Sequence, residues 1–375
     1  MPHSREEHTP PVGYCRTTGE WFAYHQARGK SMEEHFMEFY CDHSSEHVMP
    51  RGLEETVPWE FANRPFRHHP SPFLAVICDG RIWGAKGAVI TPDNKLLWDV
   101  SLEHSEQTPE QHSVFQQAHM PSVEYHAETL AVLTYTASES YFHWMLDVLP
   151  RIDLLNKSGI AIDKFVFNTS PCLPFQHQTL TALGIPPDRR IEIEAASHLR
   201  AKKLVVPSLI GYTSHYPKWA VAFLRTAFFQ YTHLSDRGKR IYISRADAKH
   251  RQLTNEQQVL KLLEPYRFQT VTLSEYTVGD QIALFASADV IVAPHGANMT
   301  NLLFCHAGTK VIELFSPGYV NPIYWAISNH AGLDYYYLIG KGRRSPQNVY
   351  ELSRAKEDIE VDLDQLSRML KLAGM

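Results

Sequence analysis

Three polar side chains recur every four residues within an otherwise apolar segment, YFHWMLDVLPR at residues 141–151. His143, Asp147 and Arg151 stand at i, i+4 and i+8, so a helix would present all three on one side. His and Asp are suited to accept a proton as general bases, and both are therefore candidate catalytic residues. Alternatively, the stripe is a self-satisfied His–Asp–Arg set that only holds the helix in register. The spacing alone leaves these two interpretations level.

A second candidate site follows the apolar run VIVA at residues 290–293, which predicts a strand. The chain continues as PHGAN at residues 294–298 and then as a predicted helix. Gly296 allows a ligand to approach the backbone closely. The free N–H groups of the first helical turn, together with the helix dipole, would bind an anion. His295 could donate to a phosphate or a ribose hydroxyl. The candidate binding residues of this turn are His295, Gly296, Ala297 and Asn298.

A basic stretch follows another predicted strand, residues 241–243. Arg245 and Arg251 stand just past the strand end, and arginine can bind phosphate through two parallel hydrogen bonds. This placement favours binding of a diphosphate group. The alternative is a solvated loop in which an arginine pairs with Asp247, worth about 0–1 kcal/mol if exposed. Asn255 and Glu256, a few residues on, are expected to brace the Arg245 loop or to touch the ligand.

Glu313 is a lone carboxylate within the apolar run of residues 310–315. A charge there is costly unless it is paired or faces a cleft. At the carboxyl end of its strand, Glu313 could accept hydrogen bonds from two ribose hydroxyls. The alternative is an ion pair within the domain, for example with Arg245.

The second half of the chain alternates strands with single helices. The predicted strands are residues 240–243, 270–273, 290–293, 310–315 and 335–339, and the predicted helices are residues 254–263, 278–287, 297–304, 322–330 and 362–372. This alternation predicts a parallel sheet covered on both faces. Ligands of such sheets bind beyond the carboxyl ends of the strands, where the turn at 294–298 and Arg245 both lie.

The first half of the chain is less regular. Its predicted strands are residues 73–77, 87–90, 96–98, 129–135, 165–167 and 204–206, and its predicted helices are residues 31–40, 141–156, 176–183 and 219–234. The polar stretch at residues 235–240, which contains Gly238, is the expected linker. Three parts are therefore expected: an extension of uncertain structure at 1–72, an α/β domain at 73–235, and a second α/β domain at 236–375 that ends in the predicted tail helix.

Composition bounds the class of protein. The 375 residues include 36 basic and 41 acidic side chains, a net charge of −5, and nucleic-acid binders usually carry a basic excess. The five cysteines are odd in number and none has C-x-x-C spacing, which favours reduced thiols in the cytoplasm. No secretory signal and no apolar run of about 18 residues is present, so no transmembrane helix is expected. A peripheral membrane association and the oligomeric state stay open.

Three motifs in the same order resemble those of glycosyltransferase family 61, over about residues 73–340. They are YFHWMLDVLPR at 141–151; ISR at 243–245 followed by LTNE at 253–256; and PHGA at 294–297 followed by NLLF at 301–304 and GTKVIEL at 308–314. The family includes plant xylosyltransferases, extracellular O-GlcNAc transferases and bacterial enzymes of capsular polysaccharide synthesis. Without a membrane anchor, this chain is expected to resemble the bacterial, cytoplasmic type.

The resemblance implies a GT-B-like architecture, with two Rossmann-like domains facing each other across a cleft. It makes 73–235 the acceptor-side domain and 236–375 the nucleotide-sugar-binding domain. It also implies an inverting transfer of a sugar from a nucleotide sugar, commonly UDP-linked, to a glycan or other hydroxyl acceptor. The one D-x-D, Asp362-Leu-Asp364, lies in the predicted tail helix, far from any strand end. No metal and no other cofactor is therefore expected. Two alternatives stay open: a nucleotide-sugar epimerase, and a non-catalytic nucleotide- or glycan-binding subunit of a polysaccharide assembly.

Overall fold

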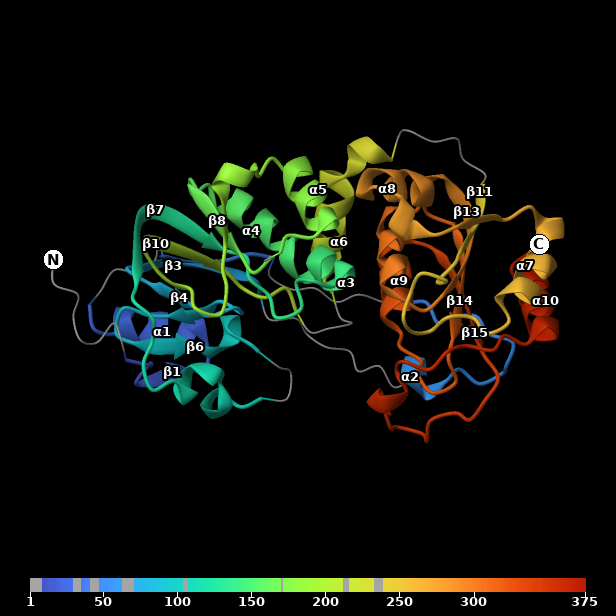
Figure 1. The fold of residues 1–375 in the computed structure, drawn as a ribbon, viewed down its shortest axis with the longest axis horizontal. Helices are drawn as coiled ribbons and strands as arrows, with labels where there is room; N and C mark the ends of the chain where they lie inside the picture. Colours follow the sequence, from blue (N-terminus) through green and yellow to red (C-terminus); the bar gives the residue numbers. More distant parts are fainter. Residues whose placement is uncertain are drawn as a thin grey trace. The chain divides into compact units, whose positions relative to one another are not determined.

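The computed structural model describes residues 9–29, 35–40, 47–62, 71–103, 107–169, 171–211, 216–232 and 239–375. The chain divides into two compact units, each made of two separate stretches of sequence (Figure 1). Unit 1 comprises residues 1–43 and 69–211, and unit 2 comprises residues 44–68 and 212–375.

Unit 1 is built on a mixed sheet. Its strands are β1 (Gly13–Cys15), β2 (Phe36–Glu38), β3 (Phe73–Cys78), β4 (Arg81–Trp83), β5 (Ala88–Ile90), β6 (Lys95–Leu97), β7 (Glu124–Val132), β8 (Lys164–Phe167), β9 (Arg190–Glu192) and β10 (His198–Pro207). The order is β1-β6-β5-β4-β10-β7-β8-β9, with β3 also paired to β10 and β2 to β3. Strand β10 is antiparallel to β3 and β4 but parallel to β7. The β10-β7-β8-β9 part is therefore parallel, as is the separate pair β1-β6, whereas the antiparallel pairings of β3, β4 and β5 depart from the expected Rossmann-like pattern.

The helices of unit 1 are short. They are α1 (Thr18–Gln26), α3 (Tyr141–His143), a π-helical turn (Trp144–Val148), α4 (Arg151–Ser158) and α5 (Pro174–Ala182), with 3₁₀ turns at Trp98–Val100, Pro109–Gln111, Ser113–Gln116 and Pro187–Arg189. The single helix expected at 141–156 is thus divided into three parts. The wider turn is closed by the N–H of Leu149, which donates to the carbonyl of Trp144, five residues earlier, at 3.1 Å. Pro150, which has no N–H, follows directly.

Unit 2 contains the predicted parallel sheet. Its strands are β11 (Lys239–Ile243), β12 (Gln269–Val271), β13 (Ala288–Pro294), β14 (Lys310–Phe315) and β15 (Asp334–Ile339), in the order β12-β11-β13-β14-β15. All four pairings are parallel. The alternation of strands and helices in this half of the sequence therefore predicted the sheet correctly, and the sheet is compatible with a GT-B-like fold.

Helices cover both faces of this sheet. They are α6 (Lys218–Ala227), α7 (Glu256–Leu263), α8 (Val278–Ser287), a 3₁₀ helix (Ala297–Phe304), α9 (Ile323–Ala331) and α10 (Leu363–Leu372), with 3₁₀ turns at Phe229–Tyr231, Glu264–Tyr266, Leu273–Glu275 and Leu352–Arg354. One face packs against α7 and α10 through a shared apolar core, which includes Ile312 and Leu314 of β14. Because side chains alternate along a strand, Glu313 points to the opposite face.

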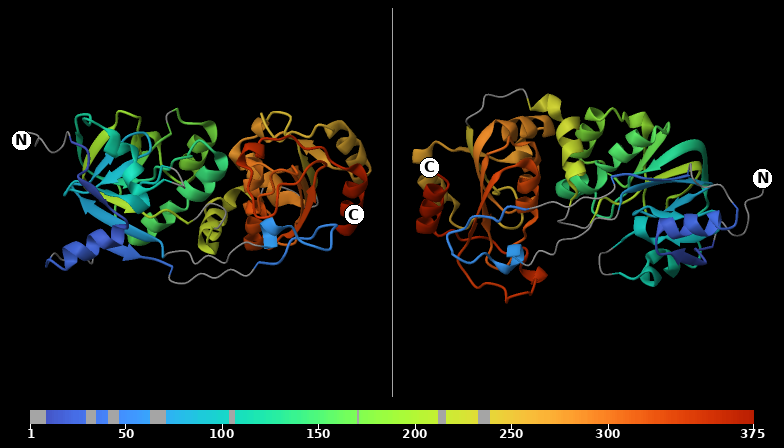
Figure 2. Two further views of the ribbon diagram at one scale, coloured as in Figure 1. Left: turned by 90° about the horizontal axis from the view of Figure 1, so that it is seen from below. Right: turned by 180° about the vertical axis from the view of Figure 1, so that it is seen from behind.

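An early segment of the chain, residues 47–62, completes the edge of this sheet. Arg51 forms a parallel bridge to Tyr336 of β15, 285 residues away, and its Nη1 also donates to the hydroxyl of Tyr336 at 3.0 Å. Helix α2 (Trp59–Ala62) follows, and Figure 2 shows it in blue beside the orange and red elements of unit 2. Phe61 of α2 is only 1% exposed. Its ring meets those of Phe315, Trp325, Tyr335 and Tyr337.

This division differs from the expected one at 1–72, 73–235 and 236–375. Residues 13–40 contribute β1, α1 and β2 to unit 1, whereas residues 47–62 belong to unit 2. Helix α6 also belongs to unit 2, and Arg225 donates to the carbonyls of Leu303 and Cys305. The difference arises because edge pairing and side-chain burial join segments that are far apart in the sequence.

Several local expectations also change. The described part of the 31–40 stretch contains strand β2 instead of a helix. Helix α6 ends at Ala227, earlier than position 234. Helix α7 begins after Asn255, two residues later than the predicted start at residue 254. Most of the expected linker, residues 235–238, lies outside the described residues.

Helices long and apolar enough to cross a membrane are absent from the described part of the chain. Four cysteines, Cys15, Cys78, Cys172 and Cys305, are free thiols, and Cys41 lies outside the described residues.

Replacing Phe61 by Ala should destabilise unit 2, because a large ring is removed from a filled aromatic cluster. We expect the free energy of unfolding in urea to fall by about 3–5 kcal/mol. Val48→Ala, in the same segment but at a position that is 76% exposed, serves as the control and should change little. Equal stability of the two variants would contradict the assignment of this segment to the core of unit 2.

Candidate functional site

The carboxyl ends of β11 and β13 bring Arg245 against Gly296. The two strands are neighbours, so the loops that follow them leave the same edge of the sheet. A Cβ atom added to Gly296 would lie 1.8 Å from Nη1 of Arg245. Gly296 has φ 175°, an extended conformation open to any residue. Glycine is therefore required here for space, because the guanidinium occupies the volume of a side chain.

Backbone carbonyls hold Arg245 in place. Its Nη2 donates to the carbonyl of His250 at 3.0 Å, while its Nε is buried with no hydrogen-bond partner. Burial lowers the pKa of Arg245, and the nearby Arg251 lowers it further. Arg245 is therefore a buried cation whose Nε–H is not used in a hydrogen bond within the protein.

Arg251 is held in a similar way. Its Nε donates to the carbonyl of His295 at 3.0 Å, and its Nη1 donates to the carbonyl of Ala355 at 2.6 Å. Among the residues that the structure describes, no carboxylate lies within ion-pair distance of Arg245 or Arg251. The pairing with Asp247 that we considered is not formed. Two uncompensated guanidinium groups side by side favour binding of an anion.

The turn after β13 begins a 3₁₀ helix, Ala297–Phe304, where an α-helix was expected. Its first backbone bond runs from the N–H of Met299 to the carbonyl of Gly296 at 2.9 Å. The hydroxyl of Thr300 donates to the carbonyl of Ala297 at 2.7 Å, a local bond that competes with regular helix. The N–H groups of Ala297 and Asn298 precede the first bond of the helix, and both residues are half-buried beside Gly296.

His295 and Glu313 form a buried pair behind this turn. Nδ1 of His295 lies 2.5 Å from Oε1 of Glu313, and the hydroxyl of Tyr335 donates to Oε2. The ring of His295 also stacks on Phe315, with the ring centroids 5.3 Å apart. Glu313 is fully buried and both of its oxygens are used. The expected bonds to a ribose are not supported, and the alternative ion pair with Arg245 is not formed; Glu313 instead positions His295.

Burial sets the protonation of this pair. It raises the pKa of Glu313 well above the usual value of a carboxyl group. It also lowers the pKa of His295 well below that of a free imidazole, and the cations Arg251 and Arg245 lower it further. Both directions favour two neutral groups that share one proton, since an isolated charge at this depth would be costly.

Asn255 and Glu256 brace the loops around the arginines. The side chain of Asn255 donates to the carbonyl of Val361 and accepts from the N–H of the same residue, at 2.8 and 3.0 Å. Oε1 of Glu256 accepts from the hydroxyls of Tyr242 and Ser244, both at 2.8 Å. Of the two roles expected for these residues, the structure supports bracing.

In unit 1, His143 and Asp147 form a hydrogen-bonded dyad. Nδ1 of His143 lies 2.7 Å from Oδ2 of Asp147. The side chain of Asp147 is 3% exposed and that of His143 is 24% exposed. Asp147 belongs to the π-helical turn, a feature often found at functional sites. The carboxylate fixes the ring through Nδ1, which leaves Nε2 as the nitrogen free to exchange a proton.

Arg151 has a separate, structural role. Its guanidinium is buried and donates to the carbonyls of Val132, Thr134 and Pro207, at 2.8–2.9 Å. Burial lowers its pKa to about 10. The polar stripe inferred from i, i+4 and i+8 spacing therefore has two parts. His143 and Asp147 form the dyad, whereas Arg151 links the carboxyl ends of β7 and β10.

Tyr335 was missed by the sequence reasoning. It lies two residues before Tyr337, which pairs with Glu313 in the register of β14 and β15. Because side chains alternate along strands, Tyr335 and Glu313 share a face. The alternation of side chains could have identified Tyr335 from the sequence only if the neighbouring strands of the sheet had been known.

Part of the chain is similar to known glycosyltransferases. Residues 141–312 match the family model described as Glycosyltransferase 61. A segment of 97 residues is 32% identical to Protein O-linked-mannose beta-1,4-N-acetylglucosaminyltransferase 2 of Mus musculus, and covers 24% of this chain and 17% of that protein. The Homo sapiens protein of the same name is 31% identical over 108 residues, which cover 27% of this chain and 18% of that protein.

The matched family segment contains the His143–Asp147 dyad, both arginines and the turn at Gly296. The chain spans less than a fifth of the length of these relatives. Together the matches support a glycosyltransferase, with similarity to the glycosyltransferase 61 family over residues 141–312. Within the described residues, no group of three or more His, Cys, Asp or Glu side chains could hold a metal ion. Asp362 of the D-x-D sequence caps α10.

Exchanging Glu313 for Gln should be tolerated, because an amide can donate to His295 and accept from Tyr335, as a neutral carboxyl does. Glu313→Ala leaves both partners unsatisfied and should cost about 1–3 kcal/mol for each. Urea unfolding measures both variants.

The pH dependence of the same two proteins checks the raised pKa. The folded wild type retains the proton of Glu313 longer than the unfolded chain, so its stability falls as pH rises from the ordinary carboxyl pKa towards the raised one. Gln does not titrate, so the stability of Glu313→Gln relative to the wild type should increase with pH. If Glu313→Gln is as unstable as Glu313→Ala at every pH, the carboxyl group of Glu313 is ionised in the folded wild type.

Proposed function

We propose that this chain is an inverting glycosyltransferase that transfers a sugar from a nucleotide sugar to a hydroxyl of a glycan or other acceptor. The observation that carries the proposal is the pair of arginines without carboxylate partners beside Gly296. They lie at the edge of a parallel sheet where ligands bind, inside the segment that matches the glycosyltransferase family.

In the proposed donor complex, the diphosphate lies against Arg245 and the N–H groups of Ala297 and Asn298. Arg251 adds positive charge and holds the carbonyl of His295 away from the ligand. Donors that are already fixed before the reaction stabilise developing charge without reorganisation. The arginines would therefore stabilise the nucleotide diphosphate as it departs.

The proposed reaction is a direct displacement. The acceptor oxygen forms a bond to the anomeric carbon while the bond from that carbon to the diphosphate oxygen breaks. The leaving nucleotide diphosphate takes the electron pair, and the acceptor hydroxyl loses its proton to Nε2 of His143. Asp147 keeps the ring in position and stabilises the imidazolium that forms, which makes His143 the base and Asp147 a positioning residue. Of the two candidate bases named from the sequence, His143 and Asp147, we thus favour His143.

The finer features of the proposal rest on the resemblance and the composition. They are a UDP-linked donor, a metal-independent reaction, two domains facing each other as in GT-B enzymes, and a cytoplasmic role in polysaccharide biosynthesis of the bacterial capsular type. No nucleic-acid partner is proposed. The relatives are N-acetylglucosaminyltransferases by name, which makes N-acetylglucosamine the first sugar to test.

Replacing Arg245 by Ala should weaken nucleotide binding by about 10- to 100-fold, because a charge-assisted hydrogen bond contributes about 1.5–3 kcal/mol. The measurement is a calorimetric titration with UDP, repeated with EDTA and in parallel with GDP, CMP and ADP. Arg240→Ala is the matched control, since Arg240 stands near the amino end of the same strand, is exposed and should not affect binding.

Each outcome of this titration is informative. UDP binding that survives EDTA and is lost only in Arg245→Ala supports the proposed donor site. Loss of binding with EDTA would contradict metal independence, and a preference for another nucleotide would replace UDP. Unchanged affinity in Arg245→Ala would remove the arginine from the site.

Measurement of kcat tests the proposed roles of His143 and Asp147. We expect His143→Gln to lower kcat by about 10²–10⁴, the usual contribution of a general base. Asp147→Asn should lower kcat less while UDP affinity stays at the wild-type value, because Asp147 acts through His143. The pH profile of the Asp147→Asn variant should also shift, which loss of structure alone would not produce.

Full activity in His143→Gln would refute its role as the base. Nucleotide binding without turnover on any acceptor would favour a non-catalytic subunit. Consumption of the donor without an acceptor would favour an epimerase.

A further inference from the structure

A cavity of about 640 Å³ lies at the carboxyl end of β15, the edge strand of unit 2. Its walls come from three segments: residues 54–62, the loop at 339–347, and Gln365 of α10. Small-molecule sites have volumes of roughly 300–1,000 Å³. All of the lining residues lie outside residues 141–312, so the matched family segment contributes nothing to this cavity.

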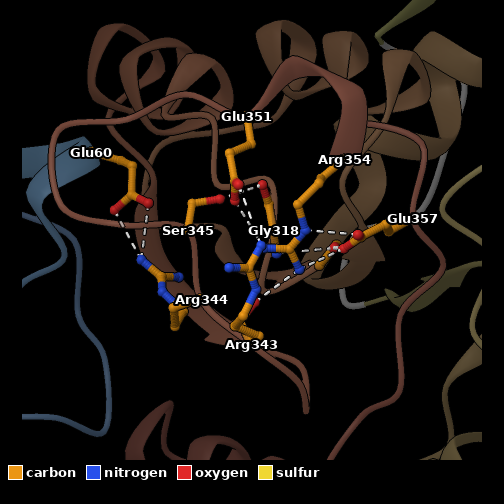
Figure 3. Close-up of polar contacts among 9 residues, drawn as sticks. Glu60, Gly318, Arg343, Arg344, Ser345, Glu351, Arg354 and Glu357 are labelled. Atoms are coloured by element: carbon orange, nitrogen blue, oxygen red, sulfur yellow. Dashed lines mark hydrogen bonds and ion pairs between the residues drawn. The ribbon is translucent and has the colours of Figure 1, made fainter.

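Polar contacts hold two of these walls together (Figure 3). Nη2 of Arg344 donates to both carboxylate oxygens of Glu60, at 2.9 and 3.0 Å, which ties α2 to the loop after β15. The hydroxyl of Ser345 donates to the carbonyl of Gly318 at 3.0 Å. Arg354 packs closely on Gly318, since a Cβ there would lie 2.5 Å from the guanidinium carbon, and Arg354 is itself paired with Glu351 and Glu357. The cavity is thus formed by fixed elements.

The charges of the cavity differ from those around Gly296. Lys341 lies 3.3 Å from Glu360, and Arg344 is paired with Glu60. Both cations are therefore compensated, in contrast to Arg245 and Arg251. A phosphate group would find no spare positive charge here.

The other lining groups suit a molecule with many hydroxyl groups. The walls carry the amides of Gln347 and Gln365, the hydroxyl of Thr56 and the carboxylate of Glu54, with the ring of Trp59 among them. Amides both donate and accept hydrogen bonds, as sugar hydroxyls do, and carboxylates accept. An aromatic ring offers an apolar surface to the C–H face of a sugar.

We propose that this cavity binds a saccharide unit of a glycan, at a site separate from the nucleotide. The loop at 316–319 connects the two places, since the ring of Tyr319 lies 5.4 Å from that of His295 and Ser345 bonds to Gly318. Strands β13 and β15 are two positions apart in the sheet, or roughly 10 Å. A glycan of a few units can therefore extend from one place to the other.

Saturation-transfer NMR on the full chain tests this site with mannose, galactose, N-acetylglucosamine and glucuronate as probes. At least one of them should receive magnetisation, and the signal should persist when UDP is added in excess. Gln347→Ala/Gln365→Ala should weaken its binding about 30-fold, because two hydrogen bonds of about 1 kcal/mol each are lost. Both glutamines are exposed, so the variant should fold normally.

The matched control is Gln257→Ala/Gln258→Ala, two exposed glutamines on α7 of the same unit, which should bind the probe as the wild type does. A signal abolished by UDP would mean that the sugar occupies the nucleotide site and would overturn the proposal. So would the absence of any signal, or equal binding in the two double variants. Arg245→Ala should retain the saccharide and lose UDP, so failure of the donor assignment is distinguishable from failure of this one.

Discussion

A guanidinium group buried without a carboxylate partner is costly, and one edge of the sheet of unit 2 places such a group, Arg245, beside the half-buried Arg251. Backbone carbonyls, whose charges are only partial, hold Arg245 and Arg251 in place. The net positive charge is therefore left available for a ligand. Gly296 is part of the same arrangement, because any larger residue would occupy the space of the Arg245 side chain. Much of the surrounding structure, including the braces made by Asn255 and Glu256, serves to keep these loops in place.

The buried pair of His295 and Glu313 also affects the charge of this site. His295 stands next to both cations, so a protonated imidazole would add a third positive charge. Burial and the two arginines keep it neutral, and a neutral Glu313 can share its proton without introducing a negative charge that would compensate the arginines. The dyad in unit 1 uses the same residue types differently. There His143 is partly exposed and Asp147 is buried, which suits a ring that exchanges protons with a substrate.

Local patterns in the sequence predicted the sheet of unit 2 and the turn at Gly296, because strands, turns and helices follow one another directly there. The contacts between Glu313, His295 and Tyr335 depend on the register of three strands, which no local pattern specifies. Spacing at i, i+4 and i+8 suggested one stripe, yet a single π-helical turn is enough to direct Arg151 elsewhere. Residues 47–62 could not be assigned to unit 2 because their partners are found near the other end of the chain. The cavity beside β15 depends on that assignment and was missed with it.

The position of residues 47–62 also affects how the protein is made. At about 5–20 residues per second, Arg51 is synthesised roughly 15–60 s before Tyr336, the residue 285 positions later with which it pairs. During that interval unit 1 can be completed, whereas Phe61 cannot yet contact the aromatic residues that bury it in the folded protein. The final edge of unit 2 must then form by closing a very long loop, which is a slow class of contact. The edge of unit 2 can therefore be completed only after the last of the described strands, β15, has emerged from the ribosome.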